Sequence, residues 1–232
     1  RVLDYLAEKP ASPAAEAVRN LRTSLVLSNV DNPPQVIMIT SSVPGEGKTT
    51  DALALAQNFA GLGKKVLLIE GDIRRRVFTQ YFDITEPRGL LAVLSGTAEP
   101  EDVVHYDERL KADLLPSEKS SINAADVFSS ESFRTFLTQA RETYDFIIID
   151  TPPVLVVPDA RVIGQSCDAI VYAVKWDSTS KHQVIEGLRQ FSTIGVKVTG
   201  LLLSQIDPAG MKRYGYGDRY GAYSSYGRKY YE

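Results

Sequence analysis

The chain has 232 residues, 44% of them hydrophobic and 24% charged, a composition typical of a folded globular protein and sufficient for one α/β domain. No apolar run approaches roughly 18 residues, so we expect neither a membrane span nor a signal peptide within it. Cys167 is the single cysteine, which excludes an internal disulfide and a cysteine-rich metal site and fits a reducing compartment. Because the sequence begins with Arg1 and not Met, we expect a piece of a longer protein.

The pattern of apolar residues predicts alternating helices and strands. Helical spacing after the cap Ser12-Pro13 predicts a helix over residues 13–29. The short apolar runs expected to form buried strands are Val36–Thr40, Lys65–Ile69, Phe146–Ile149, Ala169–Val174 and Val198–Leu203. Further helices are expected over residues 48–62, 89–95, 130–143 and 181–194. This alternation predicts a mainly parallel sheet with helices on both faces.

A glycine-rich loop lies between the first expected strand and the helix after it. It reads Ser42-Val43-Pro44-Gly45-Glu46-Gly47-Lys48-Thr49, a phosphate-binding pattern in which Ser42 replaces the usual first glycine. Such a loop directs backbone N–H groups at an anion, while Lys48 adds a charge for the β and γ phosphates and Thr49 can bind Mg²⁺. The residues expected to bind nucleotide are Pro44, Gly45, Glu46, Gly47, Lys48, Thr49 and Thr50.

Acidic residues end two of the expected strands. Asp150 closes the strand at residues 146–149, and Glu70 and Asp72 follow the strand at residues 65–69. Because the carboxyl ends of parallel strands lie at one edge of a sheet, we expect Thr49, Asp72 and Asp150 to converge and hold Mg²⁺. The sequence therefore predicts a three-layer P-loop NTPase fold that uses ATP and Mg²⁺.

The last 23 residues differ in composition from the rest of the chain. They contain no Val, Ile, Leu or Phe, so we expect a domain over residues 1–209 and a flexible tail over residues 210–232. The tail holds seven of the twelve tyrosines, namely Tyr214, Tyr216, Tyr220, Tyr223, Tyr226, Tyr230 and Tyr231. Five basic and two acidic residues give it a net charge of +3, which leaves −6 for residues 1–209. These basic residues are too few and too dispersed to predict a nucleic-acid partner.

Together these motifs resemble those of the bacterial tyrosine kinase (BY-kinase) family, the cytoplasmic kinases of polysaccharide export machinery. The resemblance covers nearly the whole chain, and the matching segments are Ser41–Thr50, Leu67–Arg74, Ile148–Pro153, the motif Glu16-x-x-Arg19-x-x-Arg22 and the terminal tyrosine cluster. The resemblance implies a deviant Walker A loop and an ATP- and Mg²⁺-dependent tyrosine autokinase that phosphorylates its tail tyrosines, generally between subunits of a homo-oligomeric ring.

The resemblance also implies roles for individual residues and a cellular setting. It implies catalytic roles for Lys48, Glu70, Asp72 and Asp150, with Glu70 as the candidate to accept the tyrosine proton. It implies ring contacts for Glu16, Arg19 and Arg22. It implies work at the cytoplasmic face of the bacterial inner membrane, regulating exopolysaccharide or capsule synthesis and export. The activator would be a membrane-embedded partner or an N-terminal transmembrane region of the same longer protein. The family usually has Asp where this chain has Glu70, and Asn where it has Ser204.

Two other functions are compatible with parts of the sequence. A partition or MinD-like ATPase of the same deviant P-loop group would carry a second lysine early in the loop, where this chain has Val43 and Pro44, and would lack the tyrosine tail. A non-catalytic nucleotide-binding regulatory module would not require Lys48, Thr49, Asp72 and Asp150 to be intact together. The sequence favours the kinase.

Overall fold

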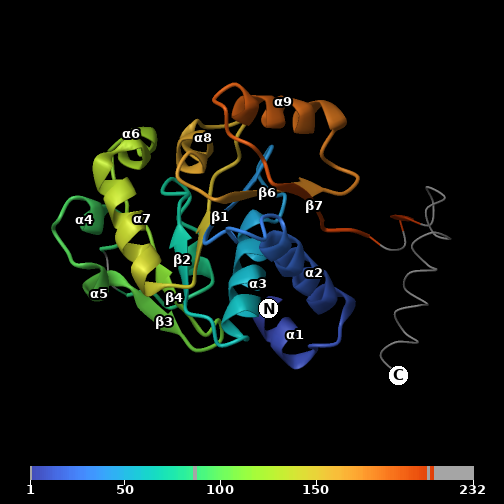
Figure 1. The fold of residues 1–232 in the computed structure, drawn as a ribbon, viewed down its shortest axis with the longest axis horizontal. Coiled ribbons are helices and arrows are strands. Elements are labelled where there is room, and N and C mark those ends of the chain that lie inside the picture. Colours follow the sequence, from blue (N-terminus) through green and yellow to red (C-terminus); the bar gives the residue numbers. More distant parts are fainter. Residues whose placement is uncertain (1, 86–87, 208–209, 212–232) are drawn as a thin grey trace.

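A computed structural model describes residues 2–85, 88–207 and 210–211 of the chain (Figure 1). Its centre is a seven-stranded sheet in the order β3-β4-β2-β5-β1-β6-β7. The strands are β1 (Val36–Ser41), β2 (Val66–Glu70), β3 (His105–Asp107), β4 (Ala112–Leu115), β5 (Phe146–Asp150), β6 (Ala169–Lys175) and β7 (Gly200–Ser204). All neighbouring strands are parallel except β3, which is antiparallel to β4. The predicted mainly parallel sheet is confirmed.

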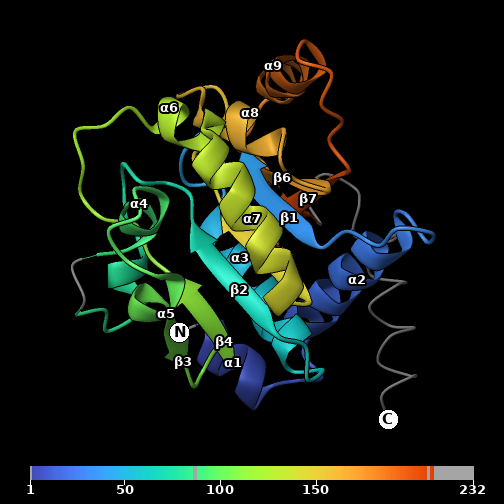
Figure 2. The same ribbon diagram turned by 60° about the vertical axis from the view of Figure 1, so that its left-hand side comes forward.

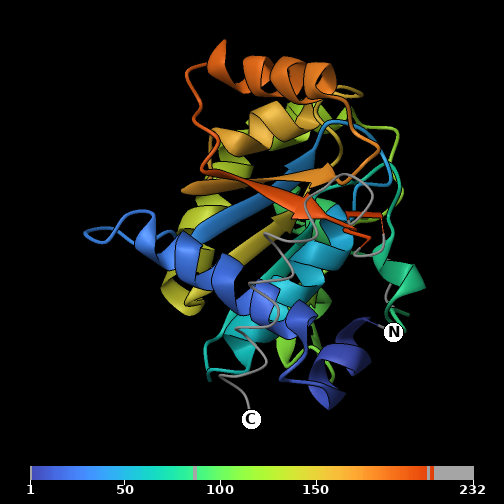
Figure 3. The ribbon, with the colours of Figure 1, turned by 90° about the vertical axis from the view of Figure 1, so that its right-hand side faces the viewer.

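Helices cover both faces of this sheet (Figures 2 and 3). They are α1 (Val2–Glu8), α2 (Pro13–Leu27), α3 (Lys48–Ala60), α4 (Leu90–Leu94), α5 (Pro100–Val103), α6 (Ala124–Ser129), α7 (Glu131–Thr143), α8 (Asp159–Gly164) and α9 (Lys181–Ser192). Helices α1 to α3 pack on one face and α4 to α9 on the other, which confirms the three-layer arrangement. Within the described residues, no helix has both the length and the apolar character needed to cross a bilayer.

Two hydrophobic cores form because the central strands are apolar on both sides. All six residues of β1 and all five of β2 are buried. Successive side chains of a strand point to opposite faces of the sheet. Val36 and Met38 therefore join the core beneath α7 and α8, while Ile37 and Ile39 join the core beneath α2 and α3. This is why the strands appear in the sequence as unbroken apolar runs rather than as alternating patterns.

In the part of the chain that the structure describes, two strands and four helices were not predicted, the helices being α1, α5, α6 and α8. The five predicted strands are present, but β3 and β4 were not predicted, because β3 is three residues long and Tyr106 at its centre is 58% exposed. The predicted helix over residues 13–29 ends at Leu27. Ser12 is its N-cap residue, as predicted, and the Ser12 side chain accepts a hydrogen bond from the Ala15 N–H at 3.2 Å.

Candidate active site

The glycine-rich loop connects β1 to the N-terminus of α3, as the sequence predicted. Gly45 has φ +82° and Gly47 has φ +93°, left-handed conformations in which any other residue except Asn or Asp would be strained. Gly47 is the N-cap of α3, so the helix begins directly at Lys48. The first N–H groups of α3 have no partner within the helix, and they form the positive end of its dipole. The loop therefore presents backbone donors to an anion.

Glu46 holds the shape of this loop from inside the protein. Its side chain is 1% exposed and accepts hydrogen bonds from the N–H groups of Val43 at 2.7 Å and Lys175 at 3.2 Å, and from the Thr179 hydroxyl. Its carbonyl accepts a hydrogen bond from the Ser204 hydroxyl at 2.6 Å. The side chain is thus committed to the protein, and any contact of Glu46 with nucleotide falls to its backbone.

Lys48, Thr49 and Asp150 lie together where α3 meets the ends of β1 and β5. The Thr49 hydroxyl donates to Oδ2 of Asp150 at 2.6 Å, while Oδ1 of Asp150 is buried without a hydrogen-bond partner. Burial raises the pKa of Asp150 to about 7, against the opposing effects of Thr49 and Lys48. Burial also lowers the pKa of Lys48, whereas the charges of Asp150 and Asp72 act to raise it.

The two acidic residues after β2 have different surroundings. Asp72 is 7% exposed, lies close enough to Lys48 to affect its pKa, and accepts a hydrogen bond from the Arg75 N–H at 3.1 Å. Glu70 is fully buried and stands opposite Asp150 in the β2–β5 register. Its Oε1 accepts from the Phe78 N–H at 2.7 Å and its Oε2 from the Ser117 N–H at 2.9 Å. The Glu70 carboxylate is occupied, so this geometry does not suit its expected role of taking a proton from a substrate.

The donor set fits a magnesium ion held together with nucleotide phosphates. The fit rests on the orphaned Oδ1 of Asp150 and on the hydroxyl of Thr49, both hard oxygen ligands. Magnesium in nucleotide sites is usually bound by one or two such residues plus phosphates and water. Within the described ranges, no group of three or more His, Cys, Asp or Glu residues is arranged to hold a metal ion.

One acidic residue near the loop, Asp51, was not predicted from the sequence. It lies in the first turn of α3, and its Oδ2 is buried without a hydrogen-bond partner. Burial, reinforced by the charge of Asp150, raises the pKa of Asp51 to about 7. An acidic residue in a first helical turn is an ordinary feature of sequences. Only the tertiary structure shows that this carboxylate is enclosed beside Gly47.

Tyr172 supports the loop at the position where the usual first glycine is missing. The hydroxyl groups of Ser42 and Tyr172 are 2.8 Å apart and fully buried, and burial raises the pKa of Tyr172 to about 12. The Tyr172 hydroxyl occupies space left by Gly187 on α9, since a Cβ atom there would lie 1.7 Å from it. Tyr172 therefore has a structural role that includes a contact with the loop.

Removing the Tyr172 hydroxyl should weaken nucleotide binding. Tyr172→Phe leaves the Ser42 hydroxyl buried without a partner, at a cost of about 1–3 kcal/mol in the free energy of unfolding, and we expect a several-fold rise in the Kd for ADP. Adding Ser42→Ala should recover most of the stability, because both partners are then apolar. Urea unfolding and nucleotide titration measure both quantities. A Tyr106→Phe variant, at an exposed position, is the control. A double variant no more stable than Tyr172→Phe would contradict the proposed interaction between the Ser42 and Tyr172 hydroxyls.

The expected ring-contact residues lie on α2, away from the loop. Arg19 is ion-paired with Glu16 and its Nη2 donates to the Pro10 carbonyl at 2.6 Å. The Nη1 of Arg22 donates to Oδ1 of Asn58 on α3 at 2.7 Å. Their role in assembly stays a prediction. The seven expected phosphoacceptor tyrosines, the last at Tyr231, lie outside the described residues, and the proposed division at residue 209 also stays a prediction.

Comparison with known proteins agrees with this class of site. Residues 34–200 match the family described as AAA domain, so the chain is a nucleotide-binding domain of the P-loop type. The septum site-determining protein MinD from Pyrococcus horikoshii, solved with Mg-ADP, is 22% identical with a TM-score of 0.59 and covers 73% of this chain and 69% of MinD. At this identity the likeness shows the fold alone.

Closer matches define the family. The tyrosine-protein kinase YwqD from Bacillus subtilis is 34% identical over 208 residues, which cover 90% of this chain and 88% of YwqD. The kinase domain of the Escherichia coli tyrosine kinase ETK has a TM-score of 0.80 at 30% identity, covering 86% of this chain and 78% of that domain. The chain belongs to the bacterial tyrosine-protein kinases, as the resemblance predicted. It spans only 28% of the length of another relative, the putative tyrosine-protein kinase EpsB from Ralstonia nicotianae, at 31% identity.

Proposed function

We propose that this chain transfers the γ-phosphoryl group of ATP to tyrosines of its own tail, residues 210–232, between subunits of a ring. The observation that carries the proposal is the meeting of Lys48, Thr49 and Asp150 at the end of a loop that presents backbone N–H groups. Membership of the tyrosine kinase family and the seven tail tyrosines support a tyrosine as the acceptor. Work at the cytoplasmic face of the membrane, in exopolysaccharide or capsule production, belongs to the same proposal.

The residues of the site divide the work of phosphoryl transfer. The loop amides and Lys48 bind the β and γ phosphates, and Thr49, Asp150 and Asp72 hold Mg²⁺ directly or through water. When bound, the ion neutralises charge on the phosphates. The tyrosine oxygen forms a bond to the γ-phosphorus while the bond to the β-phosphate oxygen breaks and ADP leaves. Positioning and charge neutralisation supply most of the rate enhancement.

We assign the acceptance of the tyrosine proton to Asp72 rather than to Glu70. Asp72 keeps an oxygen free of the Arg75 contact and lies beside Lys48, whereas Glu70 uses both oxygens to hold Phe78 and Ser117. Glu70 then acts as a positioning residue for the segments after β2 and β4. Its longer side chain, in place of the Asp usual in the family, spans the distance to these N–H groups.

Incubation with ATP and Mg²⁺ should place phosphate on the tail. We expect mass spectrometry to find phosphotyrosine within residues 210–232 and to find none when Mg²⁺ is chelated. A chain with all seven tail tyrosines changed to Phe should remain unphosphorylated while still binding ADP, which separates loss of the acceptor from loss of the site. Phosphate found only on tyrosines of residues 1–209 would refute the assignment of the tail as substrate.

A further inference from the structure

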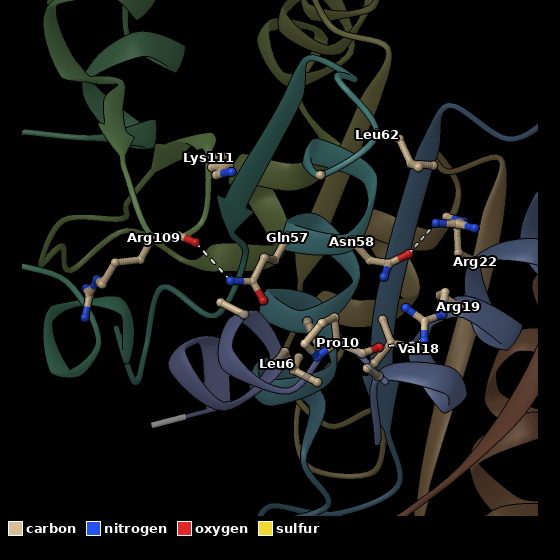
Figure 4. A pocket seen from close by; sticks show the side chains of 14 residues that line it. Leu6, Pro10, Val18, Arg19, Arg22, Gln57, Asn58, Leu62, Arg109 and Lys111 are labelled. Carbon is tan, nitrogen blue, oxygen red and sulfur yellow. Dashed lines mark hydrogen bonds between the residues drawn. The ribbon is translucent and has the colours of Figure 1, made fainter. Parts of the chain in front are cut away.

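A cavity of about 390 Å³ lies between α1, α2 and α3 (Figure 4). Its α3 residues are Ala54, Gln57 and Asn58, six to ten residues beyond Lys48, and the helical rise of about 1.5 Å per residue places them roughly 9–15 Å along the helix from Lys48. The cavity is therefore separate from the nucleotide site. A volume of this size accommodates one aromatic side chain with a polar group attached.

The walls of this cavity combine apolar surface with positive charge. The apolar lining comes from Leu6, Ala7, Pro10, Ala15, Val18, Ala54 and Leu62. Four basic residues line it, Arg19, Arg22, Arg109 and Lys111, while none of its lining residues is Asp or Glu. Arg19 and Arg22 lie on α2 at one side, and Lys111 lies across the cavity (Figure 4). An anion with an apolar body fits this combination better than a neutral or cationic ligand does.

The two arginines of α2 are held in place by their neighbours. Arg22 donates one N–H to Asn58 at 2.7 Å, and Arg19 donates to the Pro10 carbonyl at 2.6 Å besides its ion pair with Glu16. A guanidinium has five N–H donors, so the contact with Asn58 orients Arg22 and leaves it further donors, while Arg19 is oriented by its own partners. Arg109 contributes less, because its Nη2 donates to the Tyr81 carbonyl and its side chain points away from the cavity (Figure 4).

We propose that this cavity binds a phosphorylated tyrosine of the C-terminal tail. The aromatic ring lies against the apolar wall, and the phosphate accepts charge-assisted hydrogen bonds from Arg22, with Arg19 and Lys111 adding positive charge. The inference rests on the proposed function, since the tail must be a substrate for this ligand to exist. It gives the product of the reaction a binding site on the enzyme.

Charge and chain length favour the tail as the source of this ligand. The unphosphorylated tail carries +3 and is repelled by a basic cavity, whereas each phosphate adds about −1.5 to −2. The chain leaves β7 at Ser204, whose hydroxyl contacts the phosphate loop. Fifteen residues separate Met211 from Tyr226, and an unstructured chain of that length has an average end-to-end distance of about 19–23 Å. The longer spacers favour Tyr226, Tyr230 and Tyr231 as ligands over Tyr214, since the three residues from Met211 to Tyr214 extend only about 10–11 Å.

Binding of the phosphorylated tail would couple the reaction to assembly. Arg19 and Arg22 are the residues for which the family resemblance implies ring contacts. A phosphotyrosine bound beside these two arginines covers the surface at which the ring contacts are expected. Binding of the phosphorylated tail therefore competes with self-association at this site.

Peptide binding tests the proposal independently of catalysis. The protein is the full chain with its seven tail tyrosines changed to Phe, and the ligand is a fluorescent peptide of residues 221–232 phosphorylated synthetically at Tyr226. We expect fluorescence anisotropy to give a Kd at least about tenfold lower than for the unphosphorylated peptide. Arg22→Gln, which keeps an amide donor for Asn58, and Lys111→Asn, which suits the φ of +57° at this position, should each weaken binding about fivefold or more.

Controls separate a tyrosine site from a general effect of charge. Arg189→Gln removes an exposed charge on α9 and should leave the Kd unchanged. Phenyl phosphate should compete better than inorganic phosphate, because only the former fills the apolar part of the cavity. Equal affinity for the two peptides, or unchanged binding by both Arg22→Gln and Lys111→Asn, would overturn the proposal. If inorganic phosphate competed as well as phenyl phosphate, the proposed contact of the aromatic ring with the apolar wall would be wrong. Failure here leaves tail phosphorylation itself untouched.

Discussion

Replacing Lys48 by Met should reduce phosphorylation of the tail by at least about 10²–10³-fold. The ammonium group is enclosed among Asp150, Asp72 and Glu46, where it is the positive charge directed at the phosphates. Its loss removes an interaction with charge that develops on the transferred phosphoryl group, typically worth about 3–4 kcal/mol in the barrier. Quantitative phosphotyrosine blotting after incubation with ATP and Mg²⁺ measures the change.

The matched control is Lys64→Met, at an exposed lysine before β2. It should retain full activity, and circular dichroism should show that both variants are folded. If Lys48→Met labelled its tail within tenfold of the parent, the assignment of this loop as the catalytic site would be wrong.

The same variant shows which subunit receives the phosphate. Lys48→Met supplies tyrosines without activity, and the chain with seven tail Phe residues supplies activity without acceptors. In a mixture, phosphate on the Lys48→Met tail requires transfer between subunits, which is the expected result.

Changing Asp51 to Asn should stabilise the nucleotide-free protein by up to about 4 kcal/mol above pH 7. The pKa of Asp51 is raised from 3.8 to about 7 in the folded state, and each unit corresponds to about 1.4 kcal/mol. Between pH 3.8 and 7 the folded protein keeps a proton that the unfolded chain loses, so this residue lowers stability as the pH rises. Above pH 7 the penalty is complete and constant. The favourable interaction of Asp51 with the N-terminus of α3, about 0.3–1 kcal/mol, is smaller than this penalty.

Urea unfolding at a series of pH values checks the sign as well as the size. The stability difference between Asp51→Asn and the parent should grow from pH 5 to pH 7 and then level off. Asp126→Asn, at an exposed first-turn residue of α6, should show no such growth. A difference that did not depend on pH would mean that the Asp51 carboxylate titrates normally.

Two predictions about the active site depended only on the strands being parallel and on which residues end them. Thr49 and Asp150 are about one hundred residues apart in the chain, yet both were expected at one edge of the sheet because each follows a buried parallel strand. The structure places their side chains in contact. For Glu70 the same reasoning gave the correct strand end, but it could not show that both oxygens are occupied by backbone N–H groups from segments after β2 and β4.

The sequence by itself determined the class of fold, the phosphate loop, the acidic strand ends and the family, because each depends on local residue types and on the periodicity of apolar residues. The tertiary structure alone decided three further features. These are the enclosure of Asp51, the support of Ser42 by Tyr172 and Gly187, and the basic cavity between α1, α2 and α3. Each depends on side chains that are distant in the chain and meet only when helices pack on the sheet, and no local pattern records such meetings.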